Sequence, residues 1–180
     1  MPLLISDRLQ FSLITQLDLQ PIHELHSIPE IDKYNTLGIP ESIDTTKKVI
    51  TRLIEDNEKK TIQNYTFRLD NMSNEFIGLF GIKLSMNKYR RGEIWYKIHP
   101  KYWNKGYATE ALKTVINFGF DELNLHRIEA GCAVGNIGSI KVLEKAGMTQ
   151  EGKFRQLLPL KSGWSDNFEY SILESDPRKI

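Results

Sequence analysis

The sequence lacks the features that are typical of secreted and membrane-bound proteins. It has one cysteine, Cys132, so no disulfide can form within the chain, and we expect a reducing compartment, the cytoplasm. No apolar run approaches the roughly 18 residues that a membrane-spanning helix needs. The N-terminus has no basic stretch followed by an apolar one, so we expect no signal peptide. Together these absences predict a soluble, cytoplasmic protein.

An excess of one charge sign is also missing. The 24 Lys and Arg residues against 23 Asp and Glu residues leave a net charge of +1, so we expect no general attraction to nucleic acid or a membrane surface. The four histidines show no metal-ligand spacing and one cysteine cannot build a zinc site, so no metal is predicted. A length of 180 residues, 40% of them hydrophobic, suits one globular domain over residues 1–180.

The sequence does contain an alternation of strand and helix patterns. Predicted strands lie at residues 9–13, 65–70, 76–84 and 91–98, and a final hairpin at 149–158 and 164–173. Predicted helices lie at residues 18–27, capped by Asp18, and at 45–59. Between them, prolines and a glycine break residues 27–42 into a loop with room for one helical turn. This order predicts a mixed α+β sheet with helices on both faces.

One short turn has the character of a phosphate-binding loop. It reads Trp103-Asn104-Lys105-Gly106-Tyr107-Ala108-Thr109-Glu110-Ala111 and joins a predicted strand to a helix that begins near Ala108. The start of a helix leaves several backbone N–H groups unpaired and carries the positive end of the helix dipole. Small residues at Gly106 and Ala108 let a ligand's phosphates approach that backbone. The alternative is an ordinary loop that begins a helix.

A second unit follows about 25 residues later. Residues 126–134 form a predicted strand, Asn136 caps a predicted helix that contains Ser139, and Lys-Ala-Gly, ending at Gly147, closes that helix. Asn is a common helix cap and Ser is frequent in first turns, so a purely local role for both residues is one interpretation.

In this order, the two units resemble the GNAT superfamily of acetyl-CoA-dependent N-acetyltransferases. The run Tyr-Trp-x-Lys-Gly-Tyr-Ala-Thr-Glu-Ala is similar to the RimJ/RimL branch, which acetylates ribosomal-protein N-termini. The resemblance covers most of the chain, from Ser6 to Tyr170. It implies the GNAT fold: a central, mostly antiparallel twisted sheet, splayed between its fourth and fifth strands, with helices on both faces. Dimers are common in that branch, so the resemblance also implies a homodimer as one expected state.

The resemblance also assigns residues to acetyl-CoA. The turn would hold the pyrophosphate of coenzyme A through the backbone of Asn104, Lys105, Gly106, Tyr107, Ala108 and Thr109. The strand residues Tyr96, Lys97 and Ile98 would pair with the pantetheine arm and direct an N–H at the thioester carbonyl. In the family this strand carries a bulge at a glycine, where this chain has Trp95; the alternative is that Trp95 and Tyr96 only pack in the sheet.

The same resemblance suggests the catalytic groups. Asn136 would bond an amide of the pantetheine arm, and Ser139 would lie beside the sulfur and give the departing thiolate its proton. Glu93 and Glu129 are candidate general bases acting through water, or else solvated strand residues. Cys132 could form an acyl intermediate, but its apolar strand neighbours favour a core thiol.

The expected reaction is direct attack of a neutral amine on the thioester in a ternary complex. Deprotonating an α-amine at pH 7 costs about 1 kcal/mol and a lysine about 4.6 kcal/mol, which favours a protein N-terminus as acceptor. The acidic loop with Glu30, Asp32, Glu41 and Asp44 either lines a groove for a cationic peptide terminus or is simply solvated. Two alternatives stay open: a small amine such as a polyamine or aminoglycoside as acceptor, and a non-catalytic CoA-binding sensor.

Overall fold

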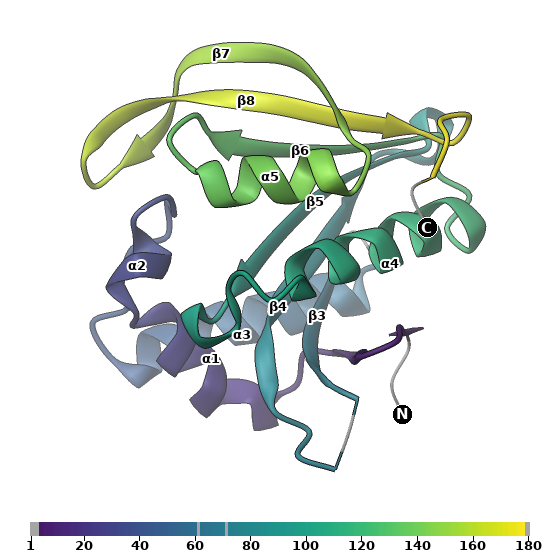
Figure 1. Cartoon of the computed structure of the whole chain (residues 1–180). Helices are drawn as coiled ribbons and strands as arrows, with labels where there is room; N and C mark the ends of the chain where they lie inside the picture. Colours follow the sequence, from purple (N-terminus) through teal and green to yellow (C-terminus); the bar gives the residue numbers. More distant parts are fainter. Residues whose placement is uncertain (1–3, 61, 71, 179–180) are drawn as a thin grey trace.

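The computed structural model describes residues 4–60, 62–70 and 72–178. In them, eight strands form one sheet in the order β1-β2-β3-β4-β5-β6-β8-β7 (Figure 1). The strands are β1 (Leu4–Ile5), β2 (Leu9–Leu13), β3 (Ile62–Leu69), β4 (Phe76–Leu84), β5 (Arg91–Ile98), β6 (Arg127–Ala133), β7 (Thr149–Leu160) and β8 (Gly163–Leu173). The mixed fold predicted from the sequence is confirmed.

Five α-helices and three 3-10 turns connect the strands. The helices are α1 (Leu19–His26), α2 (Pro29–Asp32), α3 (Ile43–Glu58), α4 (Tyr107–Asp121) and α5 (Ile137–Lys145), and the turns are η1 (Gln16–Asp18), η2 (Asn87–Tyr89) and η3 (Pro100–Tyr102). Among the described residues, none of these helices has the length and apolar character to cross a bilayer.

The sheet splays where β5 and β6 meet. These two strands pair in parallel only from Arg91 with Arg127 to Glu93 with Glu129, and then diverge. On its other edge β5 stays paired with β4 as far as Ile98. The divergence therefore lies between the fourth and fifth predicted strands, as expected; the short β1 adds one strand before them. It leaves one edge of β5 without a strand partner from Ile94 onward.

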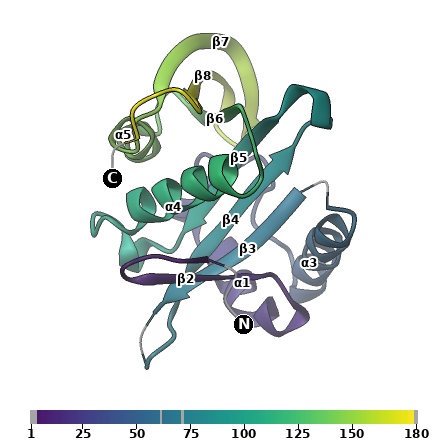
Figure 2. The same ribbon diagram turned by 90° about the vertical axis from the view of Figure 1, so that its right-hand side faces the viewer.

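The two faces of the sheet carry different helices and separate cores (Figure 2). On one face, α4 and α5 cover the larger core, which includes Ile94 and Ile98 of β5 and Ile128 of β6. On the other face, α1 and α3 cover a smaller core that contains Leu79 and is contacted by Trp95. Because side chains alternate along a strand, Glu93, Trp95 and Lys97 share this second face.

Trp95 does not disturb β5. The pairing of β5 with β4 is continuous from Gly78 opposite Ile98 to Leu84 opposite Gly92, so the bulge that the family resemblance implied is absent from this pairing. The indole occupies the space above Gly81 on the neighbouring strand, where an added Cβ would lie 2.2 Å from Trp95 Nε1. The glycine in this region is Gly81 of β4, opposite Trp95, and its missing side chain makes room for the indole.

The first helix begins differently from the prediction. Asp18 occupies the N-cap position of α1, as predicted, but its side chain makes no capping hydrogen bond. Its carboxylate instead accepts hydrogen bonds from the Thr15 N–H at 2.9 Å and from Arg68 at 2.8 Å, which orders η1 before α1. The helical turn allowed for within residues 27–42 is α2. Helix α3 begins two residues earlier than predicted, at Ile43, because the Ser42 side chain accepts from the Thr45 N–H.

Candidate active site

The turn before α4 presents unpaired backbone donors. Asn104 and Gly106 both have left-handed backbones, with φ of +60° and +82°, and Gly106 is the N-cap of α4. The first bond into the helix runs from the Glu110 N–H to the Gly106 carbonyl at 3.0 Å. Among the described residues, no group accepts a hydrogen bond from the N–H groups of residues 104–109. These donors stand at a helix N-terminus, which is the arrangement that binds anions.

Arg8, near the start of β2, fixes the shape of this turn. Its Nη1 donates to the Lys105 carbonyl at 3.2 Å, its Nε donates to Glu110 at 2.6 Å, and its guanidinium lies 4.4 Å from the centre of the Tyr107 ring. Ser6 donates to Glu110 as well, at 2.7 Å. Burial opposes the charge of Glu110, yet the bonds from Ser6 and Arg8 hold the pKa of this carboxyl below its ordinary value. Sequence reasoning missed this contact because its members lie about 100 residues apart.

Replacing Arg8 with Met should weaken acetyl-CoA binding about tenfold, because a charge-assisted hydrogen-bond pair that holds the turn is lost. The acceptor KM should not change. Isothermal titration calorimetry measures the first quantity and steady-state kinetics the second. Arg178→Met is the matched control, because Arg178 pairs with Asp121 at the far end of the same helix, at 2.7 Å. Equal affinities in the two variants would contradict a role for Arg8 in shaping the turn.

Tyr96 and Ser139 meet beside the gap between β5 and β6. The Tyr96 hydroxyl lies 2.8 Å from Ser139 Oγ, although the two residues are 43 positions apart. Burial raises the pKa of Tyr96 well above its ordinary value, so the phenol keeps its proton and can donate it. Asn136 caps α5, since its Oδ1 accepts from the Ser139 N–H at 3.2 Å. The structure therefore brings three of the predicted site residues together.

Cys132 lies in the larger core, as expected. Its side chain is buried, and burial raises the pKa of the thiol to about 11. At neutral pH almost none of it is thiolate, the form that attacks an acyl group. This favours direct attack by the amine over an acyl-cysteine intermediate.

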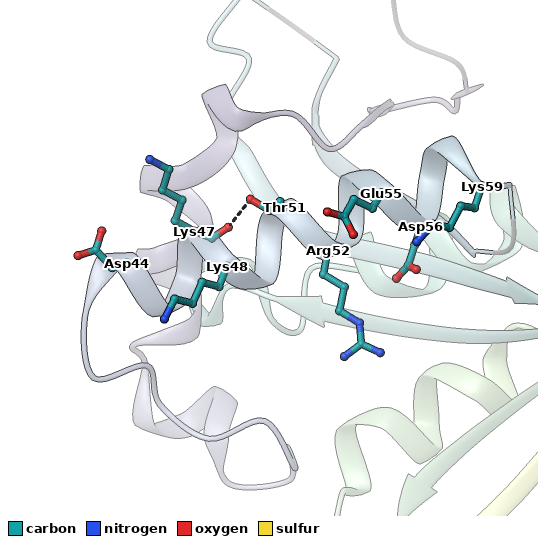
Figure 3. A pocket seen from close by; sticks show the side chains of 8 residues that line it. All are labelled: Asp44, Lys47, Lys48, Thr51, Arg52, Glu55, Asp56 and Lys59. Carbon is teal, nitrogen blue, oxygen red and sulfur yellow. Dashed lines mark hydrogen bonds between the residues drawn. The ribbon is translucent and has the colours of Figure 1, made fainter.

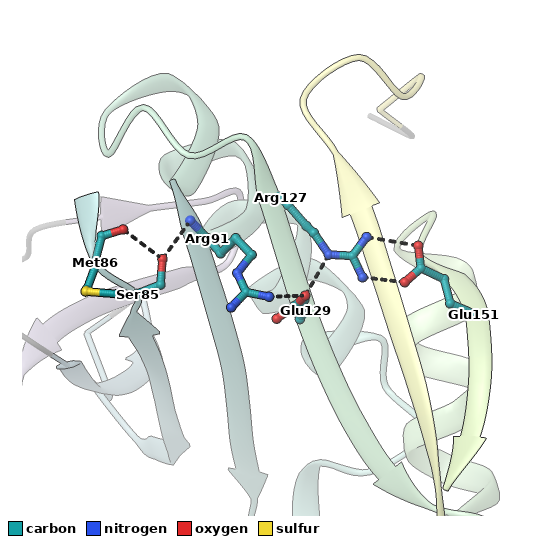
Figure 4. A network of polar contacts seen from close by, with 6 residues as sticks. All are labelled: Ser85, Met86, Arg91, Arg127, Glu129 and Glu151. Carbon is teal, nitrogen blue, oxygen red and sulfur yellow. Dashed lines mark hydrogen bonds and ion pairs between the residues drawn. The ribbon is translucent and has the colours of Figure 1, made fainter. Parts of the chain in front are cut away.

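The two carboxylates that sequence reasoning proposed as bases differ in their surroundings. Glu129 accepts from Arg127 Nε at 2.6 Å and Arg91 Nη1 at 3.4 Å, and Arg127 also binds Glu151 (Figure 4). Glu129 is therefore part of an ion-pair network on the strand surface. Glu93 is exposed, makes no ion pair among the described residues, and stands where β5 and β6 begin to diverge.

A third carboxylate, Glu169 of β8, was not predicted. It pairs with Gly131 of β6, on the face opposite Cys132, and accepts from Asn167 Nδ2 at 2.7 Å. A Cβ on Gly131 would lie 3.0 Å from Glu169 Oε1, so the glycine leaves room for this carboxylate beside the gap. Burial, together with the charges of Glu93 and Glu129, raises the pKa of Glu169. The position of Glu169 beside the gap follows from the register in which β8 pairs with β6, which the sequence alone does not give.

The acidic loop divides into exposed and buried residues. Glu30, Glu41 and Asp44 are exposed, whereas Asp32 is only 6% exposed. A shallow charged hollow also runs along the outer side of α3, lined by Asp44, Lys47, Lys48, Thr51, Arg52, Glu55, Asp56 and Lys59 (Figure 3). Its mixed charges come from one helix and its C-cap, and of the acidic-loop residues Asp44 lines it whereas Glu30, Asp32 and Glu41 do not. It is a solvated helix surface.

The family model for the acetyltransferase (GNAT) domain matches residues 8–149. The chain belongs to the GNAT family. It is 34% identical over 174 residues to the uncharacterized N-acetyltransferase YoaA of Bacillus subtilis, a match that covers 96% of this chain and 97% of YoaA. A match of 45% identity over 84 residues spans about half, 49%, of the uncharacterized N-acetyltransferase YnaD of the same organism. The predicted enzyme class, an acetyl-CoA-dependent N-acetyltransferase, is confirmed.

Solved structures agree with the fold of this GNAT chain. The crystal structure of a GNAT-family acetyltransferase from Bacillus anthracis has a TM-score of 0.84 and 31% identity, covering 96% of this chain and 99% of that one. Named relatives differ in acceptor. A spermidine N(1)-acetyltransferase of Vibrio cholerae is 26% identical over 88% of both chains, and a ribosomal-protein acetyltransferase from Vibrio fischeri shares the fold at 21% identity, with a TM-score of 0.82 over 97% of this chain and 98% of that one.

Proposed function

We propose that this enzyme, acting as one domain over residues 1–180, transfers the acetyl group of acetyl-CoA to a protein N-terminal α-amine, as the RimJ/RimL branch does. The observation that carries the donor half is the row of unpaired N–H groups at residues 104–109, next to the gap beside Tyr96 and Ser139. An acetylation assay with acetyl-CoA, peptide N-termini and small amines tests the proposed acceptor. Turnover of small amines alone would contradict a protein N-terminus as that acceptor.

The donor would lie on the α4 and α5 side of the sheet. Backbone N–H groups of residues 104–109 bind the pyrophosphate, and the free edge of β5 from Tyr96 toward Ile98 pairs with the pantetheine arm. Trp103 Nε1 already donates to the Ile98 carbonyl at 2.7 Å, and the Lys97 carbonyl faces Gly78 of β4, so the backbone of Tyr96 and the Ile98 N–H are the partners proposed for the arm, rather than Lys97. The Asn136 Oδ1 is engaged in capping, which leaves its Nδ2 to donate to a pantetheine carbonyl.

The proposed proton transfers then occur on opposite faces of the sheet, on either side of the gap. A neutral amine attacks the thioester carbon, and a β5 N–H stabilises the oxyanion that forms. Ser139 donates its proton to the departing sulfur, and the Tyr96 phenol 2.8 Å away relays a replacement proton from solvent water, so both hydroxyls end the step protonated. Glu169, on the opposite face, takes the proton that the amine loses. A carboxyl whose pKa is raised toward neutrality suits that task.

Glu169→Gln should lower kcat/KM about 100-fold at pH 7, as expected for loss of a general base. The base works only when deprotonated, so wild-type activity should fall as the pH drops toward the raised pKa of Glu169, and the variant should lack this acidic limb. A pH–rate profile measures both effects. Glu151→Gln, which alters an exposed carboxylate of β7, is the control. A variant that keeps the acidic limb would remove Glu169 from the mechanism.

The two alternatives have different standing. A polyamine acceptor is favoured by the similarity to spermidine N(1)-acetyltransferase and by the charges of Glu93 and Glu169 on one face. The non-catalytic sensor rested on Trp95 in place of the family glycine. Since Trp95 packs against Gly81 without breaking the strand pairing, that reason is gone. Acetyl transfer to any amine would eliminate the sensor.

A further inference from the structure

The segment that follows α2 reaches the turn after β6. The Tyr34 hydroxyl donates to the Gly135 carbonyl, just after β6, at 2.7 Å, and a Cβ on Gly135 would touch the Tyr34 ring at 3.3 Å. Figure 1 shows α2 between α1 and the turn that leads into α5. Asp32, two residues before Tyr34, interacts electrostatically with Lys97 of β5. The α2 segment thus contacts the turn after β6 and acts electrostatically on Lys97 of β5, on the face opposite the proposed donor site.

Asp32 is a buried carboxylate with an oxygen that nothing satisfies. Its residue is 6% exposed, and its Oδ1 has no hydrogen-bond partner among the described residues. Burying such a group without a partner is unfavourable, so these cases point to a missing ligand or to a functional role. Glu30, two residues earlier on α2, is exposed and needs no such explanation.

Lys97 lies on the same face of the sheet as α2, whose Ile31 packs against the smaller core. It pairs with Leu79, whose side chain lies in the core under α1 and α3, so Lys97 points to that face too. Burial lowers the pKa of Lys97 to about 8 and Asp32 opposes that shift. His26 of α1 is 4% exposed, and burial, then Lys97, then His23 lower the pKa of His26 to about 3, so it is neutral. Among the described residues, Asp32 and Lys97 form no ion pair within 4.0 Å.

We propose that Asp32 and Lys97 form a peptide-binding subsite, in which Asp32 accepts the N–H of the acceptor's first peptide bond and Lys97 donates to its carbonyl. This inference rests on the proposed function. A trans amide carries its donor and its acceptor on opposite sides, which matches a carboxylate and an ammonium on one face of the sheet that form no ion pair with each other. A polyamine fits less well, because its second ammonium would meet Lys97 as well as Asp32.

The test compares three acceptors. They are a tetrapeptide amide with a free N-terminus, the same peptide with its first peptide nitrogen methylated, and spermidine. With the wild-type enzyme, the methylated peptide should have a KM at least tenfold higher than the parent. Asp32→Ala should raise the parent's KM at least tenfold and abolish the difference between the two peptides, while the acetyl-CoA Kd stays unchanged. Glu30→Ala, on the same helix, should keep the difference.

Asp32→Asn serves where the alanine variant does not fold. It keeps an accepting oxygen, so it should retain the discrimination against the methylated peptide with a weaker KM. Equal loss on both peptides in Asp32→Ala would overturn the subsite. Acetylation of spermidine but of no peptide would also overturn it while leaving the enzyme class intact. Failure to acetylate any of the three, with acetyl-CoA bound, would count against the proposed acceptor as a whole.

Discussion

Ser139→Ala is expected to lower kcat about 100-fold while the acetyl-CoA Kd changes less than twofold. The hydroxyl is the group proposed to protonate the leaving thiolate, and loss of such a proton donor costs on this order. The helix should survive the change, because the bond that caps α5 is donated by the backbone N–H of residue 139, which alanine retains. Single-turnover kinetics with acetyl-CoA binding measured separately would check both values.

Tyr96→Phe is the companion variant. It removes the hydroxyl that reaches Ser139 but keeps the ring, which stacks on Phe80 at a centroid distance of 5.7 Å. Because the two hydroxyls act as one proton path, the double variant should be no slower than Ser139→Ala by more than a few-fold. A Ser139→Ala variant with wild-type kcat would contradict the shared proton path, and so would losses in kcat that are fully additive in the double variant.

Gly78→Ala should destabilise the protein by about 3 kcal/mol, a large overpacking effect. An added Cβ at Gly78 would lie 2.0 Å from the Lys97 carbonyl oxygen and 3.0 Å from the Phe67 ring. The closest contact is with backbone, so no rotamer change relieves it, and β5 itself must shift. In a chain of this size the midpoint of thermal unfolding should fall by roughly 6–12 °C.

The same substitution should also weaken acetyl-CoA binding, because β5 supplies the proposed pantetheine edge. Gly152→Ala is the matched control; its new Cβ would meet only Phe154, at 3.8 Å, so its unfolding midpoint should stay within about 2 °C of wild type. An unchanged midpoint in Gly78→Ala would show that β4 and β5 are not as close as described here.

Local patterns in the sequence located the proposed donor site. Glycine at 106 before an apolar helical stripe predicted a helix start with open N–H groups, and Asn136 predicted a cap, because each depends on a few neighbouring residues. The splayed sheet followed from the family resemblance. These features require no knowledge of which distant segments meet.

The remaining site residues depend on contacts between distant segments. Glu169 lies beside the gap only because β8 pairs with β6 in a particular register, and Arg8 reaches the turn only because the link between β1 and β2 lies beside the start of α4. The regular pairing of β5 at Trp95 also depends on a distant contact, because the space for the indole comes from Gly81 on another strand. Asp32 looked like one of four loop carboxylates until its burial distinguished it.

The most direct test of the account is a titration of the labelled protein with acetyl-CoA, followed by amide NMR. One acetyl-CoA should bind per chain. The largest amide chemical-shift changes should occur at the N–H groups of residues 104–109, with further changes at Tyr96 and Ser139. Absence of binding, or binding that leaves the amides of residues 104–109 unmoved, would contradict it.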